Sequence, residues 1–548
     1  MADILLSFGD YTEVHENQAD EVNKIHINIG QKYWCNVYGK EGTYKIIRDG
    51  EDAIISLGYV CWIDGNSVQE TLFQILISFQ ESQINNLKKR LIGEYVLLVK
   101  KGTSIYVFSD FMSVRNVFYS HDGMFISSSF TLVEDKVQRR ASDLDTYKFL
   151  EFIAMRHVLY PTWLGRSTYH KRIKWLLPYE YLVIDVDNQT FRLGSIIYSI
   201  DNKKQSDRSL LSNELISVLS EIVARKEFKY SKVAVSLTGG HDSRLIAAIA
   251  NTKFPNIRFR TAISSENPNS LKDLKVASRV SKVQQTPLDV FWFRPGRDKE
   301  RFFELTEGLS PVYNHSITPL IDGAGAYALG FGGAFGTELF MPMPWNSIED
   351  YIHTKIEGAK QALKVEDGFW EVFRESLYEQ FRITKKHFQL NNSDERDYIR
   401  LFGLLVTARY GSFIISAFNR LGYQLDPYGS YSIMDLALRI APILWGNHKR
   451  FGGMGLVQKA AMSKLNPNMG RVLTYMHSRP MLSLTIKTFP RYLIGFALQA
   501  RHVLKKRYVE SLKKPKRTNF PGGYYLSDGW ETLYIARTAK RYGIPFIP

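Results

Sequence analysis

The sequence is poor in cysteine and has no cluster of zinc ligands. Its 548 residues include two cysteines, Cys35 and Cys61, which is too few for a disulfide framework. No group of Cys and His has the spacing of a zinc site. These absences favour a reducing compartment and no structural metal, so the cytoplasm is the expected location.

A secretory signal and an uninterrupted membrane span are also missing. The N-terminus, MADILLSFGDYTEVHENQADEV, has acidic residues early and no basic segment followed by an apolar run. The best membrane candidate, residues 482–500, contains Lys487 and Arg491 and is interrupted by Pro490. A spanning helix needs about 20 mainly apolar residues, so we expect a packed or interfacial helix there.

Positive charge is in excess, and it is concentrated late in the chain. The formal net charge is +16, and residues 501–517 read RHVLKKRYVESLKKPKR. Such a run is typical of a solvated basic helix, but it also suits nucleic acid or anionic lipid. Because no aromatic ladder or zinc finger accompanies it, we expect no specific nucleic-acid partner. A peripheral contact of this tail with an anionic membrane stays open, as does the oligomeric state.

The patterns along the chain indicate more than one core. Hydrophobic residues make up 45% and charged residues 23% of the sequence, enough to bury two or three domains. β-branched and aromatic runs predict strands, and helical spacing predicts one helix over residues 72–91. The strands are expected at 53–63, 94–100, 104–110 and 124–130. A strand-rich layered domain with a helix on its sheet is the predicted result over residues 1–200.

The sequence pattern changes near residue 201. The polar stretch DNKKQSDRS, residues 201–209, predicts a linker. Beyond it come a helical segment over 210–225, the strand KVAVSL, a loop, the helix LIAAIAN and the strand IRFRTAI. Strand, helix and strand in this order form the unit of parallel sheets. We expect an α/β domain with a mostly helical later part over residues 201–500, and a basic tail over 501–548.

The stretch SLTGGHDSR, residues 236–244, joins the first strand of that unit to its helix. Two glycines at a strand end let backbone N–H groups converge, and the helix start adds partial positive charge. Hydroxyls, an arginine and an aspartate suit phosphate and its magnesium ion. The predicted nucleotide-binding residues are Ser236, Thr238, Gly239, Gly240, Asp242, Ser243 and Arg244.

The same residues also fit a connection without a ligand, in which Asp242 or Ser243 caps the helix. The spacing matches neither the Walker loop nor the dinucleotide fingerprint GxGxxG. Local chemistry therefore permits a nucleotide site without requiring one.

The motif TGGHDS, residues 238–243, resembles the SGGxDS loop of ATP pyrophosphatases, and most of the chain resembles the asparagine synthetase family. The resemblance implies an Ntn-hydrolase-like layered sandwich followed by an adenine-nucleotide α-hydrolase-like parallel-sheet domain. It implies ATP and Mg²⁺ as cofactors, cleavage of ATP to AMP and pyrophosphate, and a carboxylate activated as its adenylate for attack by an amine.

Four further stretches support the resemblance in the expected order. Residues 91–120 resemble the family's glutaminase core, and 273–282 resemble the helix after the second strand of the synthetase sheet. GAFGTELF, residues 333–340, is similar to GEGxDELF, and DPYGSYSIMDLAL, residues 426–438, is similar to a later family stretch. The glutaminase positions that match are Gly93, Asp110, Arg115 and Tyr119.

Departures from the family pattern limit the expected chemistry. Family glutaminases use a cysteine at the mature N-terminus, where this sequence has Ala2, so we predict no glutamine hydrolysis. In the second signature the first glutamate falls on Ala334 and the aspartate on Thr337. Glu338 is retained, and we predict it as a catalytic residue and, with Asp242, as a magnesium ligand.

The family also uses a lysine to stabilise charge on the transferring groups. The matching region, residues 448–467, contains Lys449, Lys459 and Lys464, of which Lys449 is the predicted catalytic residue and surface positions are the alternative.

The leading hypothesis is an AMP-forming, ATP-dependent amide ligase acting on small-molecule or peptide carboxylates and amines. The main alternative is a non-catalytic ATP-binding scaffold, which Ala2, Ala334 and Thr337 favour. A tRNA-modifying enzyme with the same loop is a third hypothesis, suggested by the basic tail. Those enzymes usually carry the loop near the N-terminus, whereas here a whole domain precedes it.

Overall fold

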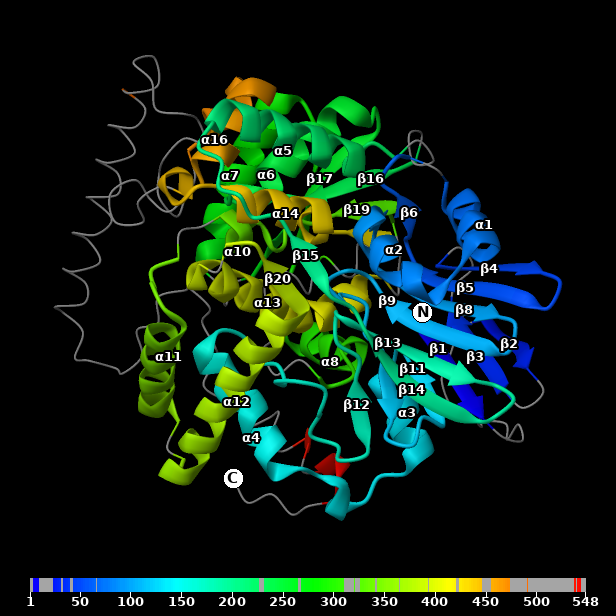
Figure 1. Cartoon of the computed structure of the whole chain (residues 1–548). Coiled ribbons are helices and arrows are strands. Elements are labelled where there is room, and N and C mark those ends of the chain that lie inside the picture. The colour runs from blue at the N-terminus through cyan, green and yellow to red at the C-terminus, as the bar shows by residue number, and fades with distance from the viewer. Residues whose placement is uncertain are drawn as a thin grey trace.

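The structure is a computed structural model, and Figure 1 shows the whole chain. It describes residues 3–8, 23–30, 33–39, 43–225, 231–264, 268–309, 326–340, 343–419, 423–445, 455–473 and 537–543, without positions 66, 364, 393 and 539, and single positions 320 and 490. Several predictions lie outside the described residues. They concern Ala2, Lys449, the basic run 501–517 and the segment 482–500, of which only Pro490 is described.

Two six-stranded antiparallel sheets form the N-terminal half (Figure 1). One has the order β12 (Ile173–Trp175), β10 (Phe118–Ser120), β11 (Phe125–Ser127), β1 (Asp3–Phe8), β3 (Tyr33–Gly39) and β2 (Asn23–Gly30). The other has the order β14 (Thr190–Ser195), β13 (Glu180–Asp185), β9 (Ser104–Ser109), β8 (Tyr95–Lys101), β5 (Asp52–Gly58) and β4 (Tyr44–Asp49).

Alternation along β8 shows how these sheets are layered. Val96 and Leu98 pack with residues of both sheets in one core. Leu97 and Val99, which point to the other face because successive strand side chains alternate, pack with a second core that contains Leu72 of α1 (Val68–Ser78). The first half therefore contains two sheets that share a core, with a helix packed on one of them; the Ntn-type layered sandwich stays a prediction.

A five-stranded parallel sheet forms the centre of the C-terminal half. Its order is β18 (Leu288–Trp292), β17 (Ile257–Ile263), β16 (Val233–Ser236), β19 (Leu329–Phe331) and β21 (Tyr423–Leu425). The chain runs from β16 through α6 (Asp242–Lys253) to β17 and through α7 (Pro268–Gln284) to β18, and then returns to the other side of β16 at β19. The direction of winding reverses between β16 and β19.

Helices make up most of the described C-terminal half outside this sheet (Figure 1). They include α5 (Arg208–Val223), α10 (Gly336–Phe340), α11 (Ile348–Ala362), α12 (Asp367–His387), α13 (Glu395–Asn419), α14 (Tyr431–Arg439), α16 (Leu456–Leu465) and α17 (Pro467–Gly470). Among the described residues one helix, Glu395–Phe418, is long and apolar enough to cross a membrane, and 83% of its apolar window is buried in the protein. Such burial is typical of a core helix.

The two halves share a core. One apolar cluster contains Leu72 and Leu97 from the first half together with Leu211 and Ile246 from the second. Helices of the first half are α2 (Ile84–Arg90), α3 (Phe130–Val137) and α4 (Thr146–Val158), and α8 (Pro295–Leu305) follows β18. Short strands β6 (Cys61–Trp62) and β7 (Leu91–Ile92) pair with each other, and β15 (Tyr198–Ile200) pairs with β20 (Phe388–Leu390) across the halves.

The predicted linker is irregular but fixed in place. Asn202 is fully buried, and its Nδ2 donates to Asp397 Oδ2 at 3.0 Å. Lys204 Nζ lies 2.6 Å from the same oxygen. Composition alone indicated a polar connection, whereas tertiary hydrogen bonds hold it against α13.

The described end of the predicted tail also contacts the body. Tyr542 Oη donates to Glu134 Oε1 of α3 at 2.8 Å, and Arg541 pairs with the other oxygen of Glu134. The Glu134 side chain is fully buried. This turn lies beside the N-terminal half (Figure 1, red), so residues 541 and 542 are not part of a free tail.

Candidate functional site

The loop 236–244 lies at the point where the parallel sheet changes its winding direction. β16 ends at Ser236 and α6 begins at Asp242. The chain segment after the neighbouring strand β19, residues 332–336, lies beside it at the same carboxyl edge. In open α/β sheets, ligands bind outside the carboxyl ends of the strands at such a point. The sheet therefore places the loop where a ligand site is expected.

The N–H groups of the loop point at acceptors within the protein. Thr238 N donates to Ser243 Oγ at 3.2 Å, and Gly240 N donates to Thr238 Oγ1 at 3.2 Å. Gly239 N donates to Asp273 Oδ1 of α7 at 2.5 Å. An incoming phosphate would replace these acceptors, and Asp273 is the one that carries a carboxyl group. Ser236, also a predicted site residue, accepts from Arg260 Nε at 3.0 Å.

The loop after β19 packs directly on the start of α6. A Cβ added to Gly333 would lie 2.6 Å from the backbone nitrogen of Ser243, and one added to Gly336 would lie 2.4 Å from Cγ of Asp242. Any larger residue at either position would therefore separate the two loops. Glycine is needed here for close approach, since neither position has a positive φ.

Two neutral groups hold the Asp242 carboxylate. Thr337 Oγ1 donates to Asp242 Oδ2 at 3.0 Å, and Gln458 Nε2 of α16 donates to Oδ1 at 2.7 Å. Burial raises the pKa of Asp242 to about 6, and these two donors offset only part of that effect. Gln458 was not predicted from the sequence.

Glu338 lies close to Asp242. Burial raises the pKa of Glu338 to about 7, and the charge of Asp242 adds to this increase. The backbone N–H of Glu338 and, to a smaller extent, the hydroxyls of Thr407 and Tyr160 oppose this increase, with Tyr160 Oη 3.4 Å from Glu338 Oε1. The structure therefore brings the two predicted magnesium ligands into one electrostatic environment. Their role stays a prediction.

Arg244 lies beneath the loop. Its side chain is fully buried, and its Nη1 donates to the carbonyl oxygen of Val472 at 2.6 Å. Nε and Nη2 have no hydrogen-bond partner within the described part of the chain, and burial lowers the pKa of the guanidinium to about 10. Among the described residues, this buried cation therefore has two nitrogen atoms without a hydrogen bond.

The two described candidate lysines differ. Lys464 Nζ donates to Ser209, Ser212 and Asn213 of α5, so its donors serve a contact between helices. Lys459 lies next to Gln458 on α16 and is 3% exposed. Lys449, the predicted catalytic lysine, lies outside the described residues.

The carboxylates present suit a metal ion that arrives with phosphate. In the part of the chain that the structure describes, no group of three or more His, Cys, Asp or Glu residues could hold a metal ion. Mg²⁺ in nucleotide sites usually binds one or two carboxylates together with substrate phosphates and water. Asp242 and Glu338 fit that donor set.

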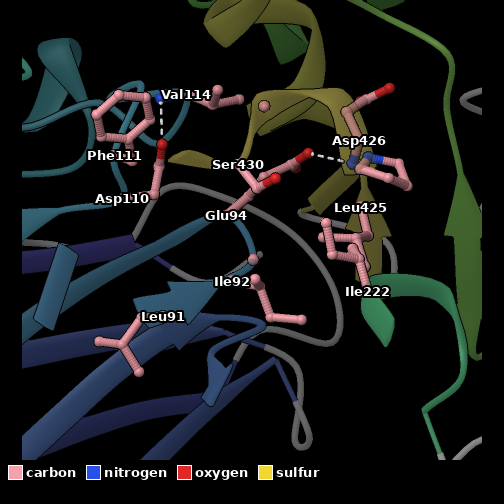
Figure 2. A pocket seen from close by; sticks show the side chains of 13 residues that line it. Leu91, Ile92, Glu94, Asp110, Phe111, Val114, Ile222, Leu425, Asp426 and Ser430 are labelled. Carbon is pink, nitrogen blue, oxygen red and sulfur yellow. Dashed lines mark hydrogen bonds between the residues drawn. The ribbon is translucent and has the colours of Figure 1, made fainter. Parts of the chain in front are cut away.

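A small cavity between the two halves adjoins the same region (Figure 2). The centre of a water molecule can occupy ≈ 10 Å³ of this cavity. That volume is enough for about one water molecule. The N–H of Asp426 donates to Glu94 Oε1 at 2.9 Å, and Asp426 Oδ1 accepts from the N–H of Ala334 at 3.0 Å. Glu94 of the first half is thus linked through Asp426 to the loop after β19.

The predicted glutaminase-like positions have structural partners. Asp110, which also lines the cavity, accepts the N–H groups of Met112, Val114 and Arg115 at 2.9 to 3.1 Å. Burial raises its pKa to about 6. Gly93, at φ +119°, lies so close to the carbonyl of Tyr59 that a Cβ would be 2.0 Å from it. Both residues shape the turns around the cavity.

No family model and no curated protein matches this chain. Among solved structures, glutamine phosphoribosylpyrophosphate amidotransferase from B. subtilis matches over 62% of this chain and 71% of its own, at 10% identity and a TM-score of 0.20. A U34-tRNA thiolase from Methanococcus maripaludis matches over 62% and 90%, at 10% identity and 0.20. An allosteric regulatory enzyme of purine biosynthesis matches over 65% and 72%, at 11% identity and 0.20. Likenesses this low support no conclusion about activity.

Proposed function

We propose that this chain is an ATP-dependent amide ligase of the asparagine synthetase type, which activates a carboxylate as its adenylate and releases pyrophosphate. The observation that supports this most is the position of the loop 236–244 at the reversal point of a parallel sheet, with Asp242 and Glu338 close together beside it. The sequence resemblance and the sheet topology are separate arguments, and both indicate a ligand site at this loop.

Each residue of the loop has a chemical role in this proposal. The N–H groups of Gly239 and Gly240 and the hydroxyls of Thr238 and Ser243 bind phosphate oxygens, assisted by the N-terminus of α6. Asp242 and Glu338 hold a magnesium ion, which neutralises phosphate charge when bound. Gln458 and Thr337 fix the direction of the Asp242 carboxylate.

The acceptor in this proposal is ammonia or an amine already present on a small molecule or peptide. Without an N-terminal cysteine the first half is not expected to release ammonia from glutamine. A cytoplasmic location, Lys449 as the catalytic lysine, and membrane contact through the basic run 501–517 belong to the same proposal.

A non-catalytic ATP-binding scaffold is the second candidate. Two observations favour it: Ala334 and Thr337 replace acidic residues of the signature, and the loop N–H groups are already bonded within the protein. Such a protein would bind ATP and release no pyrophosphate.

Exchange of labelled pyrophosphate into ATP tests the proposal without knowledge of the acceptor. The purified chain is assayed with pools of amino acids, peptides and sugar acids, and glutamate release from glutamine is followed in parallel. We expect exchange that depends on one pool, is lost in Asp242→Asn, and survives in Asp64→Asn, where an exposed carboxylate pairs with Arg90 at 3.4 Å. Magnesium-dependent ATP binding without exchange in any pool would favour the scaffold.

A further inference from the structure

Tyr160 from the N-terminal half reaches the candidate site. It lies two residues beyond the end of α4, and its Oη is 3.4 Å from Glu338 Oε1. Its ring stacks on Tyr410 of α13, with centroids 4.9 Å apart and an interplanar angle of 4°. The stacking fixes the ring, so the hydroxyl is directed at Glu338 from a rigid support.

The backbone of α10 that carries Glu338 is also held. Arg400 of α13 is fully buried, and its Nη1 donates to the carbonyl oxygens of Glu338, at 2.9 Å, and of Leu339. The position of the Glu338 backbone is therefore set by α13. Its carboxylate interacts with its own backbone N–H and with the hydroxyls of Thr407 and Tyr160, and of these three groups Tyr160 alone comes from the first half.

The first half holds the same segment at a second point. Glu94 accepts the N–H of Asp426, and Asp426 accepts the N–H of Ala334. Residues 334–338 are thus tied to the N-terminal half at both ends, through Glu94 and Asp426 at one end and through Tyr160 at the other. Sequence alone indicated no reason for the first half to be kept beyond its structure.

We propose that Tyr160 is a positioning residue of the nucleotide site, which orients the Glu338 carboxylate toward Asp242 so that the two can share a cation brought by ATP. The inference rests on the proposed function and deepens it. Groups that hydrogen-bond to metal ligands typically change metal affinity by about 10- to 100-fold when removed. Because the contact is 3.4 Å long, and such contacts often shorten when a ligand binds, we expect about 10-fold.

The test compares Tyr160→Phe with Tyr147→Phe. Tyr147 is near the start of α4, the helix that ends two residues before Tyr160, and its hydroxyl also makes one hydrogen bond across the halves, with Ser376 Oγ at 3.0 Å. Phenylalanine keeps the ring, so the Tyr160 stack on Tyr410 is retained. ATP binding is measured by calorimetry over a series of Mg²⁺ concentrations, and thermal unfolding is recorded for each protein.

We expect the Mg²⁺ concentration for half-maximal ATP binding to rise about 10-fold in Tyr160→Phe and to stay at the wild-type value in Tyr147→Phe. ATP affinity at saturating Mg²⁺ should change little in both. Equal Mg²⁺ dependence in Tyr160→Phe and wild type would overturn the positioning role while leaving the ligase proposal intact. An equal loss in both variants would assign the effect to the fold and also overturn it. Failure of the wild type to bind Mg-ATP would remove both proposals.

Discussion

Introducing an acid at position 337 tests the electrostatics of the candidate site directly. Thr337 Oγ1 donates to Asp242 Oδ2 at 3.0 Å, so Thr337→Asp exchanges a hydrogen-bond donor for a second carboxylate at nearly the same distance. Two unit charges 4 Å apart repel by about 4 kcal/mol at an effective dielectric constant of 20 and by about 1 kcal/mol in water. Residue 337 is exposed whereas Asp242 is half-buried, which places the repulsion between these limits.

The lost hydrogen bond to a charged group adds about 2 kcal/mol. We therefore expect the free energy of unfolding of Thr337→Asp to fall by about 3 to 6 kcal/mol above the pKa of both carboxyls. Mg²⁺ should recover most of this loss, because three carboxylates then surround the ion. The wild type, with two carboxylates, should not gain stability from Mg²⁺ alone.

Urea unfolding with and without Mg²⁺ measures both effects. Thr354→Asp is the matched control: Thr354 Oγ1 contacts Asp350 Oδ1 at 3.4 Å on α11, and both residues are exposed. Its stability should change little because the new charge is solvated. A Thr337→Asp protein as stable as Thr354→Asp, or one that Mg²⁺ stabilises no more than the wild type, would refute the described arrangement of Thr337, Asp242 and Glu338.

Two further changes are expected to alter stability. Burial raises the pKa of Asp242 to about 6 and of Glu338 to about 7, above unfolded values of about 4. The contribution of the two carboxyls to the free energy of unfolding is thus full below about pH 4 and is lost as the pH rises through 6 to 7. In urea titrations, a variant with Asp242→Asn and Glu338→Gln should therefore become more stable relative to the wild type as the pH rises through this range. Arg541→Ala should cost about 2 kcal/mol in the same assay, because it removes the closer of two cations from the buried Glu134 carboxylate and leaves Arg139 Nε at 3.5 Å. An unchanged midpoint, as expected for the exposed control Lys540→Ala, would contradict the docking of this turn.

The parallel sheet could be predicted because short stretches of sequence indicate its first strands and the helix between them. The apolar run before SLTGGHDSR appears as β16, and the strand, helix, strand order appears as β16, α6 and β17. The helix predicted over residues 72–91 is wrong as one element. The helix instead breaks into α1 and α2 at Phe79, and no Pro or Gly in the sequence indicates this break. Phe79 packs against Tyr106 and Phe108 of β9 instead, so tertiary contacts override the helical pattern.

The partners of the predicted site residues could not be found in the same way. Gln458 and Asp242 are 216 positions apart, and Tyr160 and Glu338 are 178 positions apart. No periodicity or spacing records a contact across such a distance. Asp273 had a weak signal, since it begins the stretch matched to a family helix, but its hydrogen bond to Gly239 depends on how α7 packs beside the loop.

Under the proposed function, the uncharged residue at position 337 has a consequence for the order of binding. Thr337 adds no negative charge to a site in which Asp242 and Glu338 already have raised pKa values. With fewer like charges the site is stable without a cation, but two carboxylates are also too few to hold Mg²⁺ by themselves. We therefore expect Mg²⁺ to bind only together with the phosphates of ATP. Under the proposed function, Ala334 and Thr337 would therefore make metal binding conditional on the nucleotide, and Tyr160 of the N-terminal half would hold the Glu338 carboxylate in position for it.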